Sequence, residues 1–343
     1  MHAAALDAHE LAQHLGATLA VDGPELLDER AEMLGIAPQE TISAGGTCRV
    51  FPATDRWVAL NLARRDDIDL LAAWMGREWE GPVWDAVATA LRSMPAADAV
   101  ERAQLLGIPA AVAVTPEEAA TDEQSRARGQ SFPPAPFLSA GVPGPRVPWP
   151  PRVIDLSSLW AGPLCGRLLA AAGAPVTKIE STTRPDGARA GPPAFFALMN
   201  GEKEQRSLDF GTASGRDELA RAIADADVVI ESSRPRAMKQ LGIDVEAEVA
   251  RGAVWVSISG YGRTGPWSNR VAFGDDAAVA GGLAVAAGSV DAPRFWGDAV
   301  ADPAAGLHAT VAALAALHIG GGHLIDVALR EVVGHLLGPE ASA

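Results

Sequence analysis

Two aspartates stand near the end of the chain, in the stretch WGDAVADPAAGLHA at residues 296–309. Asp298 and Asp302 lead into an alanine-rich apolar run, and the stretch itself contains no Lys or Arg. An Asp before Pro is a good helix N-cap, because its carboxylate accepts backbone N–H groups of the first turn. A carboxylate can also act as a nucleophile in covalent catalysis. The stretch therefore leaves capping and catalysis open for each carboxylate.

Other catalytic residue types are sparse. None of the seven histidines lies between residues 15 and 307, and no pair has the spacing of a zinc site. The chain has no Walker loop and no G-x-S-x-G elbow that would present a nucleophilic serine. His308 and His318 fall within the apolar run, where packed or partly exposed side chains are expected. The sequence therefore predicts neither a metal site nor a catalytic triad.

Composition limits the class of partner. Of 343 residues, 48% are hydrophobic and 21% are charged, which is ordinary for a globular protein. The net charge of −15 argues against nucleic acid or an anionic membrane as a partner, although a few basic groups can still bind an anion locally. Two cysteines and a first stretch without a basic leader favour a cytoplasmic protein. The apolar run at 303–319 contains Gly, His and Thr, so we expect a buried helix there rather than a membrane span.

Changes in composition divide the chain into four parts. Residues 1–35 are typical of one or two short helices. Residues 36–131 combine two short β-like runs around an Ala-Thr-Asp turn with amphipathic helices, and predict a small α+β domain. Residues 132–151 are rich in proline, which neither a helix nor a central strand tolerates, so a linker is expected. Residues 152–343 predict a large domain.

The large domain alternates buried strands with single helices. Strand-like runs occur at RVIDL, APVTKIES, DVVIESS and AVWVSIS, and helical periodicity fills the segments between them. This alternation predicts an α/β fold with a Rossmann-like parallel sheet that helices cover on both faces. Ligands bind such sheets at the carboxyl ends of the strands. The polar residues at those ends are Ser157, Ser158, Glu180, Ser181, Ser232, Ser233 and Ser259.

The first strand-to-helix turn tests for a dinucleotide site. A nicotinamide enzyme needs G-x-G-x-x-G there, so that the backbone can approach the pyrophosphate. The turn reads SSLWAGPLCG, with Gly162 and Gly166 but without that fingerprint. Glu180 ends the second strand, where a ribose-binding acid would sit, but one acid without the glycines is weak support. A nicotinamide cofactor is therefore not predicted.

Six segments of the large domain carry a resemblance to one family. Its members open with a strand, an A-G-P turn, a helix ending in L-G-A and a K-x-E strand, and this chain has VIDLSSLWAGPLCGRLLAAAGAPVTKIES. The later segments are, in order, GPPAFFALMNGEKEQRSLDF, ADVVIESSRPRAMKQLGID, WVSISGYGRTGPWSNRVAFGDD, GDAVADPAAGLHATVAALAAL and HLIDVALREVV. The large domain thus resembles the family III CoA-transferases, or CaiB/BaiF family, which includes formyl-CoA transferase and α-methylacyl-CoA racemase.

Residues 45–130 resemble the small domain of the same family. CRVFPATDRWVALNLA is similar to its Y-x-T-A-D-G hairpin, and LLGIPAAVAVTPEEAATDEQSRARG is similar to a later A-G-V-P segment and helix. In the family this part follows the large-domain motifs, whereas here it precedes them. The resemblance therefore implies a circular permutation or a piece of a tandem fusion, because domain termini tend to lie at the surface and close together.

The resemblance assigns the chemistry to Asp302. In the family, the aspartate before the x-x-[AG]-G helix start attacks an acyl-CoA thioester, which gives a mixed anhydride and CoA thiolate. The thiolate then attacks the anhydride and leaves an aspartyl-CoA thioester, which a second acid resolves. Acyl-CoA and a carboxylic acid acceptor are the implied partners, and coenzyme A is a substrate rather than a permanently bound cofactor. Asp298 precedes the motif and is expected to be structural.

The resemblance also implies a set of CoA-binding residues. They lie in the A-G-P turn, at the end of the K-x-E strand, in the N-x-x-K loop and after the E-S-S strand: Leu159, Trp160, Ala161, Ser181, Lys203, Ser232 and Ser233. Members often carry Arg where Ser181 stands, so Arg184 is the expected replacement. Arg236 adds a cation where the family has Gly.

Two other functions stay open at the level of sequence. A racemase of this family pairs the aspartate with a His in a G-H-D stretch, but this chain reads AFGDD, with Gly274 at that position and Asp275 as a poor acid. The altered order and CoA loops also fit a non-catalytic CoA-binding subunit of a heteromer. Family members form interlocked dimers, so a homodimer, or a heterodimer with a related chain, is expected.

Overall fold

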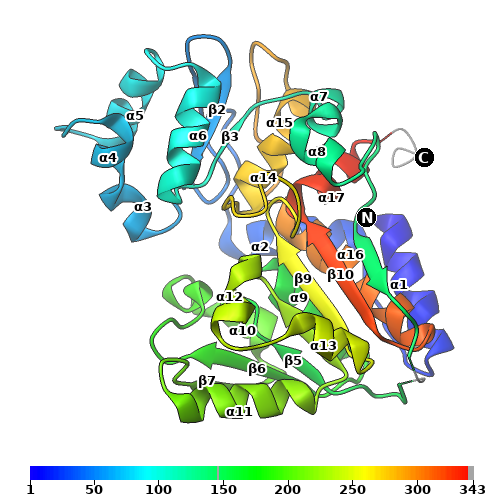
Figure 1. Ribbon diagram of the computed structural model, residues 1–343. Helices are drawn as coiled ribbons and strands as arrows, with labels where there is room; N and C mark the ends of the chain where they lie inside the picture. Colours follow the sequence, from blue (N-terminus) through cyan, green and yellow to red (C-terminus); the bar gives the residue numbers. More distant parts are fainter. Residues whose placement is uncertain (145–146, 339–343) are drawn as a thin grey trace. The chain divides into compact units, whose positions relative to one another are not determined.

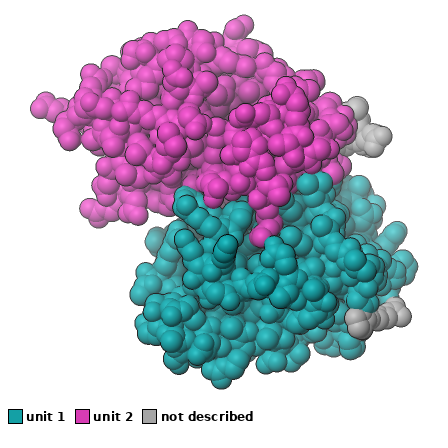
Figure 2. All heavy atoms as spheres, in the orientation of Figure 1, with its two compact units in different colours: residues 1–26, 136–259, 303–328 teal, residues 27–135, 260–302, 329–343 magenta. Residues whose placement is uncertain are grey.

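The computed structural model describes residues 1–144 and 147–338, which form two compact units (Figure 2). Unit 1 consists of three segments, Met1–Leu26, Pro136–Ser259 and Pro303–Ala328. Unit 2 consists of three others, Leu27–Ala135, Gly260–Asp302 and Leu329–Ala343. Each unit is therefore assembled from segments that are distant in the sequence.

The units cut across the predicted order of domains. After unit 2, the chain returns to unit 1 at Pro136, inside the predicted linker. Segments 260–302 and 329–338 of the predicted large domain then belong to unit 2. Residues 145–146 of the predicted linker and 339–343 of the predicted large domain lie outside the described residues. The predicted division into four parts stays a prediction about which parts fold independently.

Unit 1 is built around a seven-stranded sheet in the order β4-β10-β9-β8-β5-β6-β7 (Figure 1). Strands β5 to β10 are parallel, and β4 pairs antiparallel with β10 at one edge. Numbered along the chain, the parallel strands follow the 3-2-1-4-5-6 order of a Rossmann fold, so the predicted fold class is confirmed. The strands are β4 (Leu138–Gly141), β5 (Val153–Asp155), β6 (Val176–Ser181), β7 (Glu204–Leu208), β8 (Val228–Glu231), β9 (Val254–Ser259) and β10 (His323–Ala328).

Side chains alternate between the two faces of this sheet. Ile154, Val229 and Trp255 point to one face and form a buried cluster with residues of α11, α12 and α13. Helix α9 covers the strands on the other face. Helix α16 packs closely on α9, and the absence of a side chain at Gly306 permits this, because a Cβ there would have no room beside the carbonyl oxygen of Ala161. The bounds are α9 (Ala161–Ala171), α11 (Ala213–Ala224), α12 (Pro235–Gln240), α13 (Val245–Ala250) and α16 (Ala301–His318).

The edge strands β4 and β7 have no strand signature in the sequence. Only the last residue of β7, Leu208, is buried, and every residue of β4 is exposed or half-buried. An edge strand that buries little apolar surface shows no hydrophobic alternation. The proline-rich segment was predicted to hold no central strand, and β4 agrees with that prediction because it lies at the edge.

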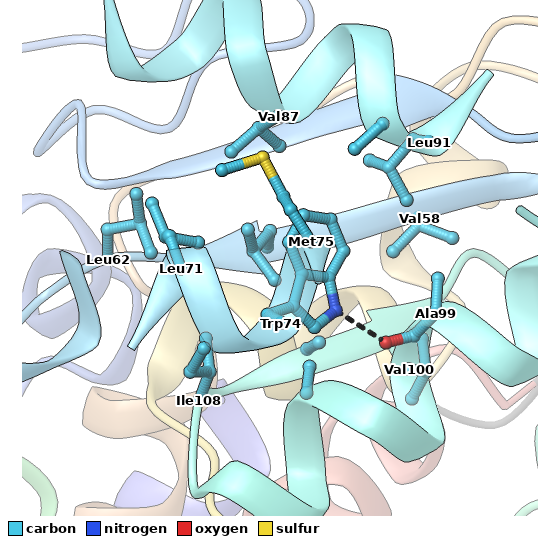
Figure 3. Packing of buried hydrophobic residues seen from close by; sticks show 14 of the residues in the cluster. Val58, Leu62, Leu71, Trp74, Met75, Val87, Leu91, Ala99, Val100 and Ile108 are labelled. Carbon is cyan, nitrogen blue, oxygen red and sulfur yellow. Dashed lines mark hydrogen bonds between the residues drawn. The ribbon is translucent and has the colours of Figure 1, made fainter. Parts of the chain in front are cut away.

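Unit 2 contains a three-stranded antiparallel sheet in the order β1-β2-β3. The predicted hairpin is confirmed as β1 (Cys48–Pro52) and β2 (Trp57–Asn61), and β3 (Ala110–Val112) pairs with β2. On one face, Trp74 and Met75 pack among residues of β2, α5 and α6 (Figure 3). The indole N–H of Trp74 donates to the carbonyl oxygen of Ala99 at 3.0 Å, so this buried ring is satisfied. The helices here are α4 (Leu71–Met75), α5 (Val83–Leu91) and α6 (Ala96–Leu106).

The other face of the small sheet is covered by helices from the segment that follows β9. Cys48 and Ala59 form a buried cluster with residues of α14 (Gly274–Ala280) and α15 (Leu283–Ala287). Because side chains alternate along β2, Asn61 points to this same face and reaches Asp276 in the first turn of α14, 215 positions away. The fold of unit 2 thus joins segments that no local pattern connects.

The remaining elements are short, apart from the two helices predicted within residues 1–35, which are present as α1 and α2. They are α1 (His2–His14), α2 (Gly23–Leu34), α3 (Arg65–Asp69), α7 (Pro116–Thr121), α8 (Glu123–Ala127), α10 (Pro193–Asn200), α17 (Leu329–Leu336) and the 3-10 helix η1 (Gly187–Ala190). The apolar run at 303–319 is helical as predicted, within α16. None of the described helices has the length and apolar content that crossing a membrane needs.

Candidate active site

The carboxyl ends of three neighbouring strands of unit 1 carry most of the residues predicted to bind CoA. Strand β5 lies between β6 and β8, and the strand order reverses at the β5–β8 pair, where ligands of such sheets bind. The N–H of Ser158 donates to the hydroxyl of Ser232 at 3.1 Å and ties the two strand ends together. The predicted residues that end these strands or follow them are Leu159, Trp160, Ala161, Ser181, Arg184, Ser232, Ser233 and Arg236.

These residues differ in what they present to solvent. Trp160 and Ala161 are buried at the start of α9, whereas Arg184 and Arg236 are exposed. Glu180, the acid at the end of β6, is held in an ion pair with Arg189 at 2.6 Å. The exposed arginines therefore bring positive charge to this edge of an acidic chain.

The turn after β5 is held by internal hydrogen bonds. The N–H of Ser157 donates to Asp155 Oδ1 and the N–H of Leu159 donates to Asp186 Oδ1, both at 2.9 Å. Leu159 has a φ of +71°, which non-glycine residues adopt rarely, and its bond to Asp186 holds it there. In a dinucleotide fold the amides of this turn face a pyrophosphate. Here carboxylates occupy them, in agreement with the missing glycine fingerprint.

Lys203, a predicted CoA ligand, is buried and its ammonium group is fully engaged. It donates to Asp155 Oδ2 at 2.7 Å and to the carbonyl oxygen of Pro163 at 2.8 Å. A third bond, at 2.9 Å, goes to Asn200 Oδ1, so all three protons are used. Gly166 permits this arrangement, since a Cβ there would lie 2.9 Å from Lys203 Nζ. Lys203 precedes β7, and its side chain reaches from the amino end of that strand to the end of β5 and the first turn of α9.

A second buried pair supports the same turn. Lys178 pairs with Asp186 at 2.9 Å and donates to the carbonyl oxygen of Ser157 at 2.8 Å. Burial acts to raise the pKa of Asp155, but the charges of Lys203 and Lys178 outweigh it and hold that pKa below its ordinary value. Two lysines and two aspartates thus balance charge in the core beneath the turn.

Asp302, the predicted nucleophile, clusters with unit 2 and lies in the first turn of α16. The helix begins at Ala301, two residues earlier than an N-cap at Asp302 would require. Three further carboxylates lie around it: Asp275, Asp276 and Asp298. Asp276 and Asp298 are completely buried and Asp275 is 8% exposed, whereas Asp302 is partly exposed. Of the four carboxylates, Asp302 is the one best placed to meet a ligand.

The neighbours of Asp302 have structural partners. Asp276 accepts from Asn61 Nδ2 at 2.8 Å and from the N–H of Phe273 at 3.0 Å. Asp275 accepts from the N–H of Ala299 at 3.1 Å. These bonds fasten β2 and the turn before α16 to the start of α14, so both carboxylates are accounted for by the fold.

Asp298 pairs with Arg30 on α2. The Nε of Arg30 donates to Asp298 Oδ2 at 2.6 Å, and its Nη2 donates to Asp298 Oδ1. No sequence pattern indicates this partner, because 268 positions separate the two residues and Arg30 belongs to no recognisable motif. The pairing agrees with the structural role expected for Asp298.

Burial shifts the titration of this carboxylate cluster. It raises the pKa of Asp302 to about 7, with Arg30 and the N–H of Gly274 opposing the shift and Asp275 adding to it. Burial likewise raises the pKa of Asp275 to about 6 and that of Asp276 to about 7. Carboxyl groups that titrate near neutral pH are concentrated at functional sites.

Gly274 lies directly against the carboxylate of Asp302. A Cβ at position 274 would be 2.4 Å from Asp302 Oδ2 and 2.4 Å from the carbonyl oxygen of Ala299. Both separations are far inside van der Waals contact, so this backbone has no space for a side chain there. The acid–base His that a racemase would carry at this position does not fit.

The described part of the chain has no group of side chains that could bind a metal ion. Within residues 1–144 and 147–338, no three His, Cys, Asp or Glu side chains are grouped so that they could hold a metal ion. His308 is buried in α16, where its Nδ1 donates to the carbonyl oxygen of Ala304 at 2.9 Å. Cys48 and Cys165 are buried thiols whose pKa burial raises. These residues therefore pack the core.

Comparison with known proteins places the chain in a family. The family model for CoA-transferase family III matches residues 151–343. An acyl-CoA transferase of Fusarium pseudograminearum is 35% identical over 208 residues, which cover 54% of this chain and 46% of that protein. The succinyl-CoA–D-citramalate CoA-transferase of Chloroflexus aurantiacus is 31% identical over 196 residues, which cover 53% and 49% of the two chains. A solved CaiB/BaiF family protein of Brucella suis is 31% identical, with 56% of each chain covered and a TM-score of 0.51.

The Rossmann-ordered sheet thus agrees with an α/β protein of the CaiB/BaiF class. The chain belongs to CoA-transferase family III. It spans about half the length of the curated relatives it matches. The matched region coincides with the predicted large domain, while the resemblance at residues 45–130 and the permuted order stay predictions.

Proposed function

We propose that this protein is an acyl-CoA:carboxylate CoA-transferase with Asp302 as its nucleophile. One observation carries the proposal: Asp302 is the partly exposed member of a group of four carboxylates, and each of the other three is buried and accepts at least one structural hydrogen bond. Membership of a family whose relatives are named as CoA-transferases supports the same assignment.

The reaction begins when ionised Asp302 attacks the carbonyl carbon of an acyl-CoA. The C–S bond breaks, CoA leaves as thiolate, and an acyl-aspartyl anhydride forms. The thiolate then attacks the aspartyl carbonyl carbon. The bond between this carbon and the bridging oxygen of the anhydride breaks, and the acyl group departs with that oxygen as a free carboxylate. An incoming carboxylate reverses these steps on the aspartyl-CoA thioester and leaves as the new acyl-CoA. The N–H of Gly274 and the first turn of α16 would stabilise the negative charge on these oxygens.

We assign CoA binding to the carboxyl edge of the sheet in unit 1. Arg184 and Arg236 would meet the phosphates, since both are exposed cations that follow strand ends. The hydroxyls of Ser232 and Ser233 lie at the same edge. Lys203 would act indirectly, by supporting the turn that contains Leu159. The family resemblance further implies a homodimer or a heterodimer with a related chain, which light scattering of the purified protein measures.

Intact mass spectrometry tests the proposed function. The protein is incubated with short-chain acyl-CoAs, including succinyl-CoA and formyl-CoA. We expect a gain equal to coenzyme A minus water, reversed by hydroxylamine, which leaves a hydroxamate on the peptide that contains Asp302. Deuterium exchange at the acyl α-carbon without an adduct would instead indicate racemase chemistry, and CoA binding with neither result would indicate a binding subunit.

The rate of adduct formation should rise with pH around a midpoint near 7. Only the ionised carboxylate attacks, and burial raises the pKa of Asp302 to about 7, so the reactive fraction grows between about pH 6 and 8. Single-turnover measurements across this range give the profile. A rate that stays constant from about pH 5 to 8 would mean that Asp302 titrates normally or that another group attacks.

Adding one methyl group at position 274 is expected to damage catalysis. In Gly274→Ala the new Cβ would fall 2.4 Å from Asp302 Oδ2, so the carboxylate must move. A displacement of about 1 Å can lower turnover about a hundred-fold. Gly191→Ala is the matched control, because the nearest atom to a Cβ there, the carbonyl oxygen of Ala188, is 3.4 Å away, which is ordinary van der Waals contact. Equal turnover in the two variants would contradict the close contact between Gly274 and Asp302.

A further inference from the structure

Arg30 is the cation that faces the carboxylate cluster, and no motif of the sequence singles it out. It lies on α2, and its guanidinium contacts both oxygens of Asp298. The side chain of Arg30 is 21% exposed and that of Asp298 is completely buried. Such a two-point contact fixes direction as well as distance, because the guanidinium is planar and its donors are rigidly spaced.

The turn that Arg30 holds leads directly to the nucleophile. Asp298 is followed by Ala299, which has a φ of +45°, a left-handed conformation that is costly for a residue with a Cβ. The N–H of Ala299 donates to Asp275, and its carbonyl oxygen accepts the N–H of Asp302 at 2.8 Å. A strained residue persists only when its surroundings determine it. Arg30 and Asp275 are the two side chains that anchor this turn.

The charges around Asp302 make Arg30 important in a second way. Asp275 and Asp276 face the cluster from α14, and Asp298 faces it from the turn, so each of these neighbours is acidic. Ser43, Cys48 and Asn61 approach the cluster from the small sheet and its loop and are neutral. Arg64, in the loop after β2, lies over the ring of Phe273 and is paired with Asp67. Arg30 is the positive group that acts on Asp302.

We propose that Arg30 is a positioning residue for Asp302: it fixes the Asp298 turn and supplies the positive charge that favours the ionised form of Asp302. The proposal rests on the proposed function, in which Asp302 is the nucleophile. It gives a role to α2, within the segment at residues 1–35 that was recognised only as helical. Loss of the two-point contact between Arg30 and Asp298 would displace the carboxylate of Asp302. Loss of the positive charge would suppress the ionisation of Asp302.

The test separates charge from geometry with two variants. Arg30→Gln removes the charge, whereas Arg30→Lys keeps the charge and loses the two-point contact. The direct measurement is a carboxyl infrared titration, taken as the difference between each protein and its Asp302→Asn counterpart. It reports the ionisation of Asp302 and needs no turnover.

We expect the midpoint of Asp302 to move upward by about one pH unit in Arg30→Gln, which corresponds to roughly tenfold less carboxylate well below the midpoint. Adduct formation by Arg30→Gln should be slow at neutral pH and recover at alkaline pH. In Arg30→Lys the midpoint should stay close to that of the wild type, while the rate falls at every pH. Arg270→Gln is the matched control, since Arg270 is 17% exposed and pairs with Glu101 in the same unit.

An unchanged midpoint in Arg30→Gln would overturn the proposal, even if the variant were less stable. A midpoint that moves equally in Arg270→Gln would overturn it as well, because a general loss of packing would then be the cause. Failure of the proposed function looks different. In that case the wild type forms no adduct at Asp302, while the infrared titration still decides whether Arg30 controls this carboxylate.

Discussion

Replacing Asp302 with asparagine should abolish the CoA adduct and lower CoA transfer at least about a thousand-fold. Asparagine has nearly the same size, but its neutral amide does not attack a thioester. The fold should survive: burial raises the pKa of Asp302 from its ordinary value of 3.8 to about 7. This carboxyl group therefore lowers stability progressively as the pH rises from about 4 to 7, and the loss is complete above about pH 7, whereas the neutral amide carries no such cost. Thermal unfolding at about pH 8 should therefore show an equal or higher Tm.

Asp291→Asn is the control for this experiment, because Asp291 is an exposed aspartate of the same unit. It should keep both the adduct and the rate of label exchange between a free carboxylate and its CoA ester. An Asp302→Asn protein that still forms a hydroxylamine-sensitive adduct would place the nucleophile elsewhere. The three buried carboxylates would then be the next candidates.

The largest expected effect on stability comes from Lys203→Met. Removing one partner of a buried ion pair leaves the other charge without compensation and costs about 3–5 kcal/mol. Asp155 would lose the ammonium that lies 2.7 Å away and would remain completely buried. Urea denaturation followed by tryptophan fluorescence measures the loss of unfolding free energy.

Two comparisons sharpen this measurement. Arg206→Met breaks a pair whose side chains are 37% and 40% exposed, and should cost less than about 1 kcal/mol. Asp155→Asn combined with Lys203→Met should recover part of the loss, since no unpaired charge is then buried. Unchanged stability of Lys203→Met, together with a raised KM for acyl-CoA, would restore Lys203 to the predicted role of direct CoA ligand.

The two lysine–aspartate pairs bear on the CoA binding that we propose for this edge of the sheet. Their carboxylates and the backbone carbonyls they hold fix the turn around Leu159 before any ligand arrives. A preformed turn lowers the entropic cost of binding, because fewer groups must be ordered. The exposed cations Arg184 and Arg236 lie outside this network and remain available to an anionic substrate.

Strand and helix positions in both units were readable from the sequence wherever burial imposes a period. Strand β1 shows alternating burial, β2 is a continuous buried run after Trp57, and the helices after β5 and β8 follow the predicted order. The edge strands β4 and β7 were not readable, because their side chains are mostly exposed and carry no apolar pattern. Local periodicity reports burial, and these strands bury little.

The residues of the candidate site were likewise indicated by local sequence patterns, but the contacts of their side chains were not. Its key residue, Asp302, and the residues after β5, β6 and β8 were named from motifs, because each lies within a contiguous stretch that resembles the family. Lys203 came from the same motifs, yet the structure shows its ammonium fully engaged by Asp155, Pro163 and Asn200. A motif gives a residue's place in the chain, whereas burial and hydrogen bonding determine what its side chain is free to do.

The sequence by itself determined the fold class, the family resemblance and the carboxylate at the start of the apolar helix. Only the tertiary structure decided which carboxylates are structural, because that depends on partners far away in the chain. Asp298 meets Arg30 across 268 positions, and Asp276 meets Asn61 across 215. It also decided that Gly274 lies against Asp302 and leaves no room for a second acid–base side chain. The physical reason is that charge pairing and close packing act through space, whereas a sequence pattern records only what neighbours along the chain require.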